Sequence, residues 1–140
     1  MKRKSNDNMI RFVAKFPVIF KKSTPKRVQN EYLGHVSELI TKLYLWCCGY
    51  SIIKSRYKNP FGEIDIIAKR GGSVVFTEVK YRHNLDDGLS CLSLYQQKRI
   101  TNGAKHFLYK HPHYAHFQMR FDVFVLSSKG MKRLKNAWID

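Results

Sequence analysis

The sequence predicts a mixed α/β domain in which helices flank a central mixed sheet, and the order of its apolar patterns carries this prediction. Apolar residues recur at helical spacing over residues 31–48 and 92–109. Four runs have the composition of strands, three between these helices and one after them: residues 50–57, 63–68, 73–82 and 120–126. Helix, three-strand meander, helix and strand is an order typical of a sheet covered by helices. The length of 140 residues fits one such domain.

The first predicted helix runs from Glu31 to Cys48 and is followed by Gly49, because glycine is favoured just after a helix C-terminus. Its apolar side chains form one stripe: Tyr32, Val36, Leu39, Ile40, Leu43 and Cys47. We expect most of this stripe to pack in the core. Glu38 falls roughly opposite the stripe, where it is either solvated or part of a site.

Short turns set the pairing of the predicted strands. The predicted strands at residues 63–68 and 73–82 are joined by a short turn at Gly71-Gly72, so they should be antiparallel neighbours. We expect polar loops at residues 83–88 and 111–116. Residues 131–139 fit either a short helix or a last strand.

Charge is the clearest compositional signal. The chain has 26 Lys and Arg against 10 Asp and Glu, a formal net charge of +16, and such an excess predicts attraction to polyanions, above all nucleic acid. Residues 1–30 hold nine basic residues and one acid, and we treat them as a basic N-terminal arm ahead of a domain at residues 31–140. The apolar residues 9–20 leave three interpretations open: a mobile arm, an element packed on the domain, and a weak membrane-surface or transit-like element.

The cysteines and the hydropathy pattern indicate the cellular setting. The three cysteines form no CxxC pair, which argues against a zinc cluster or a disulfide framework. An odd number of cysteines suits a reducing compartment, so we expect a cytoplasmic protein. No apolar run approaches the roughly 20 residues of a membrane span, and we expect no integral membrane insertion.

Two acids stand in otherwise apolar strands, and they need an explanation. Side chains alternate across a strand, so Glu63, Asp65 and Ile67 should share one face, and Glu78 and Lys80 should lie side by side on the next strand. Carboxylates are rarely buried without a partner or a cation. Asp65 and Glu78 with Lys80 therefore predict either a magnesium-type phosphodiesterase site or a structural ion pair, and the spacing alone leaves both open.

Three segments carry a resemblance to a known family. They are Gly-Glu-Ile-Asp-Ile-Ile-Ala at residues 62–68, Phe-Thr-Glu-Val-Lys-Tyr-Arg at residues 76–82 and Arg-Phe-Asp-Val at residues 120–123. Together they closely resemble the YraN-type family of bacterial proteins, which looks like a branch of the PD-(D/E)xK superfamily of restriction endonucleases and Holliday-junction resolvases. The resemblance runs from about residue 31 to the C-terminus.

This resemblance implies a restriction-endonuclease-like fold and a metal-dependent endonuclease that hydrolyses phosphodiester bonds. It implies magnesium or manganese as the cofactor, nucleic acid as the partner, and a homodimer as one form of the chain. DNA is the favoured substrate, selected by structure instead of sequence, because no base-reading motif is apparent and the basic balance favours backbone contact.

Residue by residue, the resemblance makes Asp65, Glu78 and Lys80 the catalytic set. Asp65 and Glu78 match its metal-binding acids, and Lys80 matches the lysine that steadies the phosphate or the attacking water. Glu38 matches a further acid that resolvase-like members add from the first helix. Ile64 stands where the superfamily carries a proline.

Further residues are candidates for phosphate contact. Lys98 matches a lysine often found in the family's second long helix, with Gln97 beside it, and Arg82 and Arg56 are candidates on electrostatic grounds. The alternative for each is a solvated surface position. Four aromatic residues fit either base stacking or the core: Tyr57, Phe61, Tyr81 and Tyr95.

Two further groups are assigned structural roles. Arg120 and Asp122 share a strand face and are expected to form an ion pair. The three histidines of the 111–116 loop are expected at the surface, since no acid or cysteine lies near them.

Two other functions remain open. A nucleic-acid-binding module that keeps the fold without turnover predicts salt-sensitive binding and no products. A protein-interaction or membrane-surface protein would depend on the basic arm instead of on Asp65.

Overall fold

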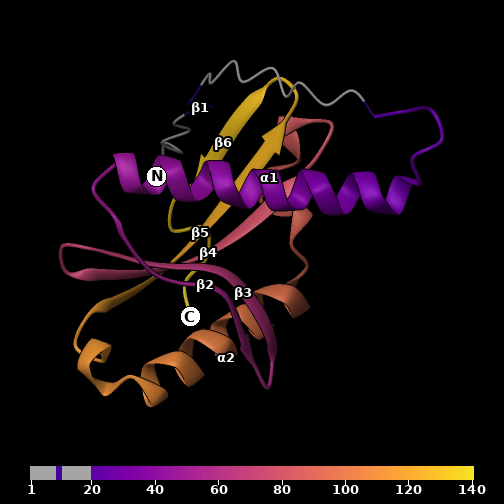
Figure 1. Cartoon of the computed structure of the whole chain (residues 1–140). Coiled ribbons are helices and arrows are strands. Elements are labelled where there is room, and N and C mark those ends of the chain that lie inside the picture. The colour runs from indigo at the N-terminus through magenta and orange to yellow at the C-terminus, as the bar shows by residue number, and fades with distance from the viewer. Residues whose placement is uncertain (1–8, 11–19) are drawn as a thin grey trace.

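A six-stranded sheet forms the centre of the protein in the computed structural model, which describes residues 9–10 and 20–140 (Figure 1). For residues 9–10 and 87–89 the structure describes the backbone but not the side chains. The helices and strands are β1 Met9–Ile10, α1 Lys26–Cys47, β2 Ser51–Asn59, β3 Gly62–Arg70, β4 Ser73–Tyr81, α2 Leu94–Lys110, β5 Gln118–Ser127 and β6 Gly130–Leu134. Two short 3-10 helices complete the set, η1 Leu85–Cys91 and η2 Pro112–Tyr114.

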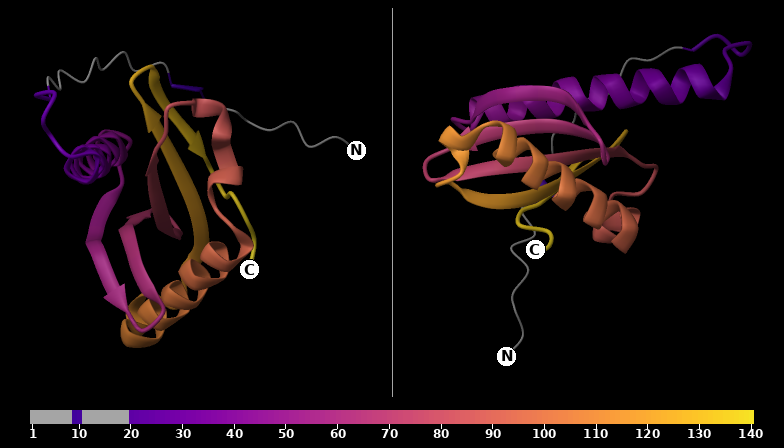
Figure 2. Two further views of the ribbon diagram at one scale, coloured as in Figure 1. Left: turned by 90° about the vertical axis from the view of Figure 1, so that its right-hand side faces the viewer. Right: turned by 90° about the horizontal axis from the view of Figure 1, so that it is seen from below.

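The strand order is β1-β6-β5-β4-β3-β2, and the sheet is mixed. β3 and β4 are antiparallel neighbours joined at Gly71-Gly72, as predicted. β4 and β5 are parallel, because α2 carries the chain back across the sheet between them. α1 and α2 lie on opposite faces of the sheet (Figures 1 and 2). The predicted α/β class is confirmed, and the arrangement is consistent with a restriction-endonuclease-like fold.

Side chains of β4 alternate between two buried clusters, one beneath each helix. Val74 and Phe76 belong to the cluster under α2, which also holds Ile100, Phe107 and Phe121. Val75 belongs to the cluster under α1, with Leu45, Tyr50 and Phe124 among its other members. The sheet is thus covered on both faces, which holds the central strands rigidly for a site at their ends.

The buried face of α1 differs from the predicted one. Leu45 and the small residues Ser37 and Thr41 are buried, whereas Leu39 and Leu43 are exposed. The prediction that most of the apolar stripe packs in the core is therefore wrong. α1 packs chiefly against β4, and small side chains let a helix lie close to a strand, so size decides the buried face here more than hydrophobicity does.

The helices extend slightly differently from their predicted ranges. α1 begins at Lys26, five residues before the predicted start. α2 begins after Ser93, whose hydroxyl accepts a hydrogen bond from the N–H of Gln96 in a capping box. The polar loop expected at residues 83–88 is partly wrong, because η1 begins at Leu85, and such short 3-10 turns have no periodic signal in a sequence.

The first and last strands lie side by side at one edge of the sheet. β6 pairs antiparallel with β5, which decides the C-terminal alternative in favour of a strand. β1, from the basic arm, pairs antiparallel with β6 at the sheet edge. The rest of the arm up to residue 19 lies outside the described residues. Among the residues described, no helix is both long enough and apolar enough to cross a membrane.

A buried ionic cluster ties β5 to β6. Asp122 is fully buried and is bound by Arg120 and Arg133 at 2.9 Å and 2.8 Å. Both guanidinium groups also donate to the hydroxyl of Tyr50, at 2.8 Å and 3.0 Å. Burial acts to raise the pKa of Tyr50, but these hydrogen bonds lower it overall. The predicted pairing of Arg120 with Asp122 is confirmed, and its role is structural.

Candidate functional site

Strands β3 and β4 stop pairing where the two acids stand. Their ladder runs from Arg70 and Ser73 to Ile66 and Thr77 and goes no further. One residue beyond, Oδ2 of Asp65 accepts a hydrogen bond of 2.8 Å from the backbone N–H of Val79. The carboxyl group thus takes the place of a ladder bond and keeps the half-buried N–H of Val79 satisfied at the point where the strands separate.

The backbone on the other side of Asp65 is irregular as well. Ile64 and Ile67 belong to the same buried cluster although they are three residues apart, so strict alternation does not run through Asp65. The prediction that Glu63, Asp65 and Ile67 share one face is therefore wrong. Ser55 pairs with Ile66 and Tyr57 with Ile64, which places Arg56 across from Asp65.

Asp65 has a strongly perturbed acidity. Burial raises its pKa, the negative charge of Glu78 raises it further, and the value reaches about 8 in spite of the Val79 hydrogen bond and the charge of Lys80. The carboxyl group is therefore mostly protonated near neutral pH in the absence of a bound cation. Such a perturbation marks a group that a nearby positive charge would ionise.

Glu78 and Lys80 lie side by side on β4, as the spacing predicts. Nζ of Lys80 is 2.7 Å from Oε1 of Glu78, and their side chains are 21% and 12% exposed, respectively. The pair is thus shielded from most of the solvent, and its attraction is stronger than that of a surface ion pair.

α1 brings Glu38 to the same region. Nε and Nη2 of Arg56 donate to its two carboxylate oxygens at 2.9 Å and 3.1 Å, and Nη2 also lies 2.9 Å from Nδ1 of His35. Glu38 raises the pKa of Arg56 through this hydrogen bond, and the charges of Glu63 and Asp65 add to the effect. Glu38 is thus neither free nor fully solvated, because Arg56 serves as its cation.

Arg56 reaches this position through an uncommon backbone conformation. Its φ is 51°, in the left-handed region, although it lies within β2. For a residue with a side chain this costs about 1–2 kcal/mol, and such strain persists only where neighbouring structure enforces it.

The donor set suits a hard divalent cation. Among the residues that the structure describes, no three His, Cys, Asp or Glu side chains converge closely enough to hold a metal by themselves. Magnesium commonly uses one or two carboxylates, with water and substrate phosphate as its other ligands. Asp65 and Glu78 meet that requirement, and Glu38 would join them only after leaving Arg56.

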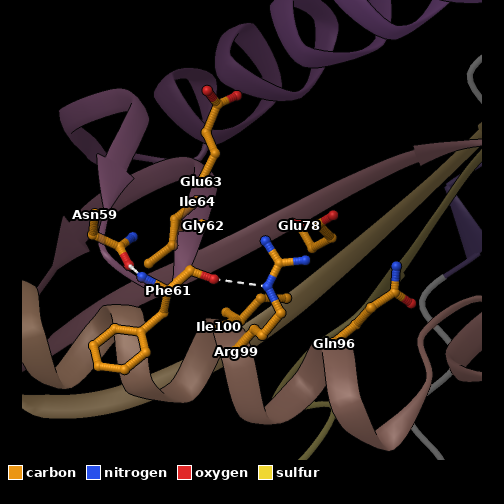
Figure 3. A pocket seen from close by; sticks show the side chains of 9 residues that line it. All are labelled: Asn59, Phe61, Gly62, Glu63, Ile64, Glu78, Gln96, Arg99 and Ile100. Carbon is orange, nitrogen blue, oxygen red and sulfur yellow. Dashed lines mark hydrogen bonds between the residues drawn. The ribbon is translucent and has the colours of Figure 1, made fainter.

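A small hollow of about 60 Å³ opens beside Glu78, between the tip of the β2–β3 hairpin and α2 (Figure 3). Its lining includes Glu63, Glu78, Gln96 and Arg99. Nε of Arg99 donates to the carbonyl oxygen of Phe61 at 2.7 Å, which fixes the guanidinium group over the hairpin tip. In Figure 3 the carboxylate of Glu63 points away from Arg99.

Gln96 and Arg99 line the hollow beside Glu78, whereas the sequence predicts Gln97 and Lys98 as phosphate contacts. A shift of one residue along a helix changes the direction of a side chain by about 100°. Nε2 of Gln97 donates to the carbonyl oxygen of Leu92 at 3.2 Å, outside the hollow. The capping box at Ser93 was the signal that would have fixed the helical phase.

The remaining candidates for phosphate contact are dispersed. Lys98 is exposed and lines a second hollow with Tyr95 and Arg99. Arg82 is half-buried, and its Nη1 donates to the carbonyl oxygen of Tyr81 at 2.8 Å. The structure therefore brings Asp65, Glu78 and Lys80 together, with Arg56 and Glu38 beside Asp65, and leaves Arg82 apart.

The histidines of the 111–116 loop are only partly at the surface. His113 and His116 are exposed, as expected. His111 is half-buried instead, because its ring stacks on Phe107 at a centroid distance of 4.3 Å.

The sequence comparisons agree on one family. The model of the uncharacterised protein family UPF0102 matches residues 37–126, a range that holds Glu38, Arg56, Asp65, Glu78 and Lys80. A UPF0102 protein of Bradyrhizobium diazoefficiens is 38% identical over 113 residues, covering 81% of this chain and 85% of its own. One from Ehrlichia ruminantium is 39% identical, with coverage of 81% and 88%. One from Rhodopseudomonas palustris is 37% identical, with coverage of 84% and 87%.

Proposed function

The chain belongs to the uncharacterised protein family UPF0102, the YraN-type family of the sequence resemblance, and we propose that it is a metal-dependent nuclease. One observation carries the proposal. A carboxyl group with a pKa of about 8, that of Asp65, stands by Glu78 at the point where two strands separate, and Glu78 itself is paired with Lys80. An acid with a raised pKa, beside a second acid and a lysine, forms a set of side chains suited to phosphodiester hydrolysis.

Asp65 and Glu78 would hold the metal, magnesium or manganese, both of which prefer oxygen ligands. When bound, such an ion neutralises phosphate charge and lowers the pKa of an attacking water. Its charge would also ionise Asp65. Lys80 is held by Glu78 at 2.7 Å, and from there its ammonium group orients the phosphate or the water.

Nucleic acid is the proposed partner, and DNA the favoured one. The net charge of +16 attracts a polyanion. Backbone contact of this kind selects nucleic acid by structure more than by sequence. Action in the cytoplasm fits the free thiols of Cys47, Cys48 and Cys91. A homodimer, which the resemblance also implies, is tested by sedimentation equilibrium.

A binding protein without turnover is the second candidate. The specific observation in its favour is that Glu38 and Glu78 each already have a cationic partner within the chain, Arg56 and Lys80. Ion pairs of this kind also occur as purely structural features, in which each carboxylate is neutralised by its partner and no metal is needed.

Cleavage assays separate the two candidates. Labelled single-stranded, duplex, flapped and four-way-junction DNA, with matching RNA, are incubated with magnesium or manganese and, separately, with EDTA. A nuclease gives metal-dependent products that Asp65→Asn and Lys80→Ala abolish while binding is kept. Asp140→Asn is the matched control, since its carboxylate pairs with Lys105 at the exposed end of the chain. Binding without products on every substrate contradicts the nuclease proposal and favours the binding protein.

A further inference from the structure

Two aromatic rings are held in solvent beside the proposed site. Phe61 and Tyr95 are 42% and 72% exposed, whereas Tyr57 and Tyr81 are half-buried against the core clusters. Of the four aromatic residues that fit either stacking or packing, these two are the ones available for stacking. Single exposed rings are common on proteins, so their surroundings decide whether they form a site.

Phe61 and Tyr95 line one hollow, here called the Phe61–Tyr95 hollow. Its volume is about 360 Å³, and its lining is Pro60, Phe61, Tyr95, Lys98, Arg99 and Asn102. That volume lies within the range of about 300–1,000 Å³ usual for ligand sites. No lining residue is acidic, two are cationic and one carries an amide, so the hollow is complementary to an anion that bears a flat ring.

Arg99 links the backbone of Phe61 to the ring of Tyr95. Its Nε donates to the carbonyl oxygen of Phe61 at 2.7 Å, and its Cζ lies 5.9 Å from the centroid of the Tyr95 ring. Oδ1 of Asn59 accepts from the N–H of Phe61 at 2.9 Å, which holds the hairpin tip. The hairpin tip that carries Phe61 and the guanidinium group beside the Tyr95 ring are therefore positioned by the fold before any ligand arrives, which lowers the entropic cost of binding.

Phe61 and Arg99 also line the smaller hollow that contains Glu78 (Figure 3). The two hollows therefore share a wall, and a chain whose phosphate lies at Glu78 and Lys80 would place a neighbouring nucleotide beside Phe61 and Tyr95.

We propose that the Phe61–Tyr95 hollow binds an unpaired nucleobase of the nucleic-acid substrate, next to the phosphate at the carboxylate–lysine site. Stacking on Phe61 and Tyr95 requires a free base face, which a base inside an intact duplex does not offer. Lys98 and Arg99 contact the adjoining phosphates. This inference rests on the proposed nucleic-acid function and narrows its substrate to single-stranded or locally unpaired segments.

The test is binding in EDTA of a fluorescent single-stranded oligonucleotide and of the same sequence as a blunt duplex. Tyr95→Leu and Phe61→Leu should each weaken single-strand binding by about 5- to 150-fold, because a stacked base is worth about 1–3 kcal/mol, and duplex binding should change by less than about twofold. Tyr95→Phe should restore single-strand binding, since it keeps the ring.

Tyr109→Leu is the matched control. Tyr109 is 79% exposed on the same helix, and Nζ of Lys110 lies 5.9 Å from its ring centroid, so it has the same chemistry outside the hollow. Thermal unfolding of every variant shows whether the fold is kept.

The possible outcomes are distinguishable. Equal weakening on both substrates, or loss with Tyr109→Leu as well, overturns the stacking inference and leaves the nuclease proposal standing. Ring-dependent binding without cleavage in any metal upholds the inference and contradicts the nuclease. No binding to any nucleic acid overturns both.

Discussion

The carboxyl group of Asp65 accepts a 2.8 Å hydrogen bond from the backbone N–H of Val79, one residue after Glu78. This bond holds Asp65 against β4 where the ladder has ended. It also keeps the acid close to Glu78. Burial of the Asp65 carboxyl group, and then the negative charge of Glu78, raise the pKa of Asp65 to about 8. The relationship links the opening of the sheet to the chemistry of the site.

Asp65 should make the protein less stable as the pH rises. Its pKa is about 8 in the folded chain and about 3.9 in an unfolded one, so between these values the folded state holds one proton more. The contribution of Asp65 to the free energy of unfolding is then fully present below about pH 4. It falls by at most about 1.4 kcal/mol per pH unit up to about pH 8. Asp65→Asn should remove this slope and raise stability at pH 8, because the amide oxygen can still accept from Val79. Urea unfolding in EDTA at pH 5, 6.5 and 8 measures the free energy of unfolding of wild type and Asp65→Asn. Identical pH slopes in the two proteins would falsify the raised pKa assigned to Asp65.

The strained backbone at Arg56 should tolerate glycine and reject β-branched residues. Its φ of 51° costs glycine nothing, and its ion pair with Glu38 is weak because the arginine side chain is 43% exposed. Arg56→Gly should therefore change stability by less than about 1 kcal/mol, whereas Arg56→Val should destabilise by about 1–2 kcal/mol. Ser55→Val is the control, since its backbone is an ordinary exposed strand. Equal effects of valine at both positions, in urea unfolding, would argue against strain.

The buried Asp122 cluster should be essential to the fold. Asp122→Asn leaves Arg120 and Arg133 without their anion, and breaking a buried pair costs about 3–5 kcal/mol. Asp140→Asn removes a carboxylate from an exposed pair with Lys105, which should cost less than about 1 kcal/mol. Chemical denaturation at pH 7 compares the two, and a loss below 1 kcal/mol at Asp122 would show that the arginines find other partners.

Gly62 should be needed for the position of Arg99. Its φ is 138°, and a Cβ at this residue would collide with Nη2 of Arg99. Gly62→Ala should therefore destabilise the hairpin by about 1–2 kcal/mol and displace the guanidinium group from the shared wall. Gly72→Ala is the control, because no atom of the described residues lies within 4 Å of its added Cβ. The expected readout is weaker single-strand binding by Gly62→Ala alone, and unchanged binding would mean that Arg99 reaches the ligand from another position.

Much of the fold follows from local pattern. The period-two alternation of β4 placed Glu78 beside Lys80, and the turn at Gly71-Gly72 made β3 and β4 neighbours. Both depend on short-range geometry, which a sequence shows directly. The pairing of Arg120 with Asp122 followed from the same rule.

The sequence predictions that the structure corrects depend on tertiary geometry. The outward stripe of α1, with Leu39 and Leu43 exposed, depends on how closely the helix approaches β4. The cation beside Glu38 comes from Arg56, eighteen residues away, through a left-handed φ that no propensity predicts. Arg99 enters the site because of a hairpin tip 38 residues earlier in the chain. None of these relations leaves a periodic signal.

The nuclease proposal is tested by the initial rate of oligonucleotide cleavage by wild type and Asp65→Asn at saturating magnesium, on the substrate that both bind equally in EDTA. Loss of a metal ligand removes several kcal/mol of charge stabilisation, so we expect a fall of about 100-fold or more for Asp65→Asn, with Asp140→Asn unchanged. Cleavage by Asp65→Asn at the wild-type rate, or no magnesium-dependent cleavage by wild type on any bound substrate, would contradict the nuclease proposal.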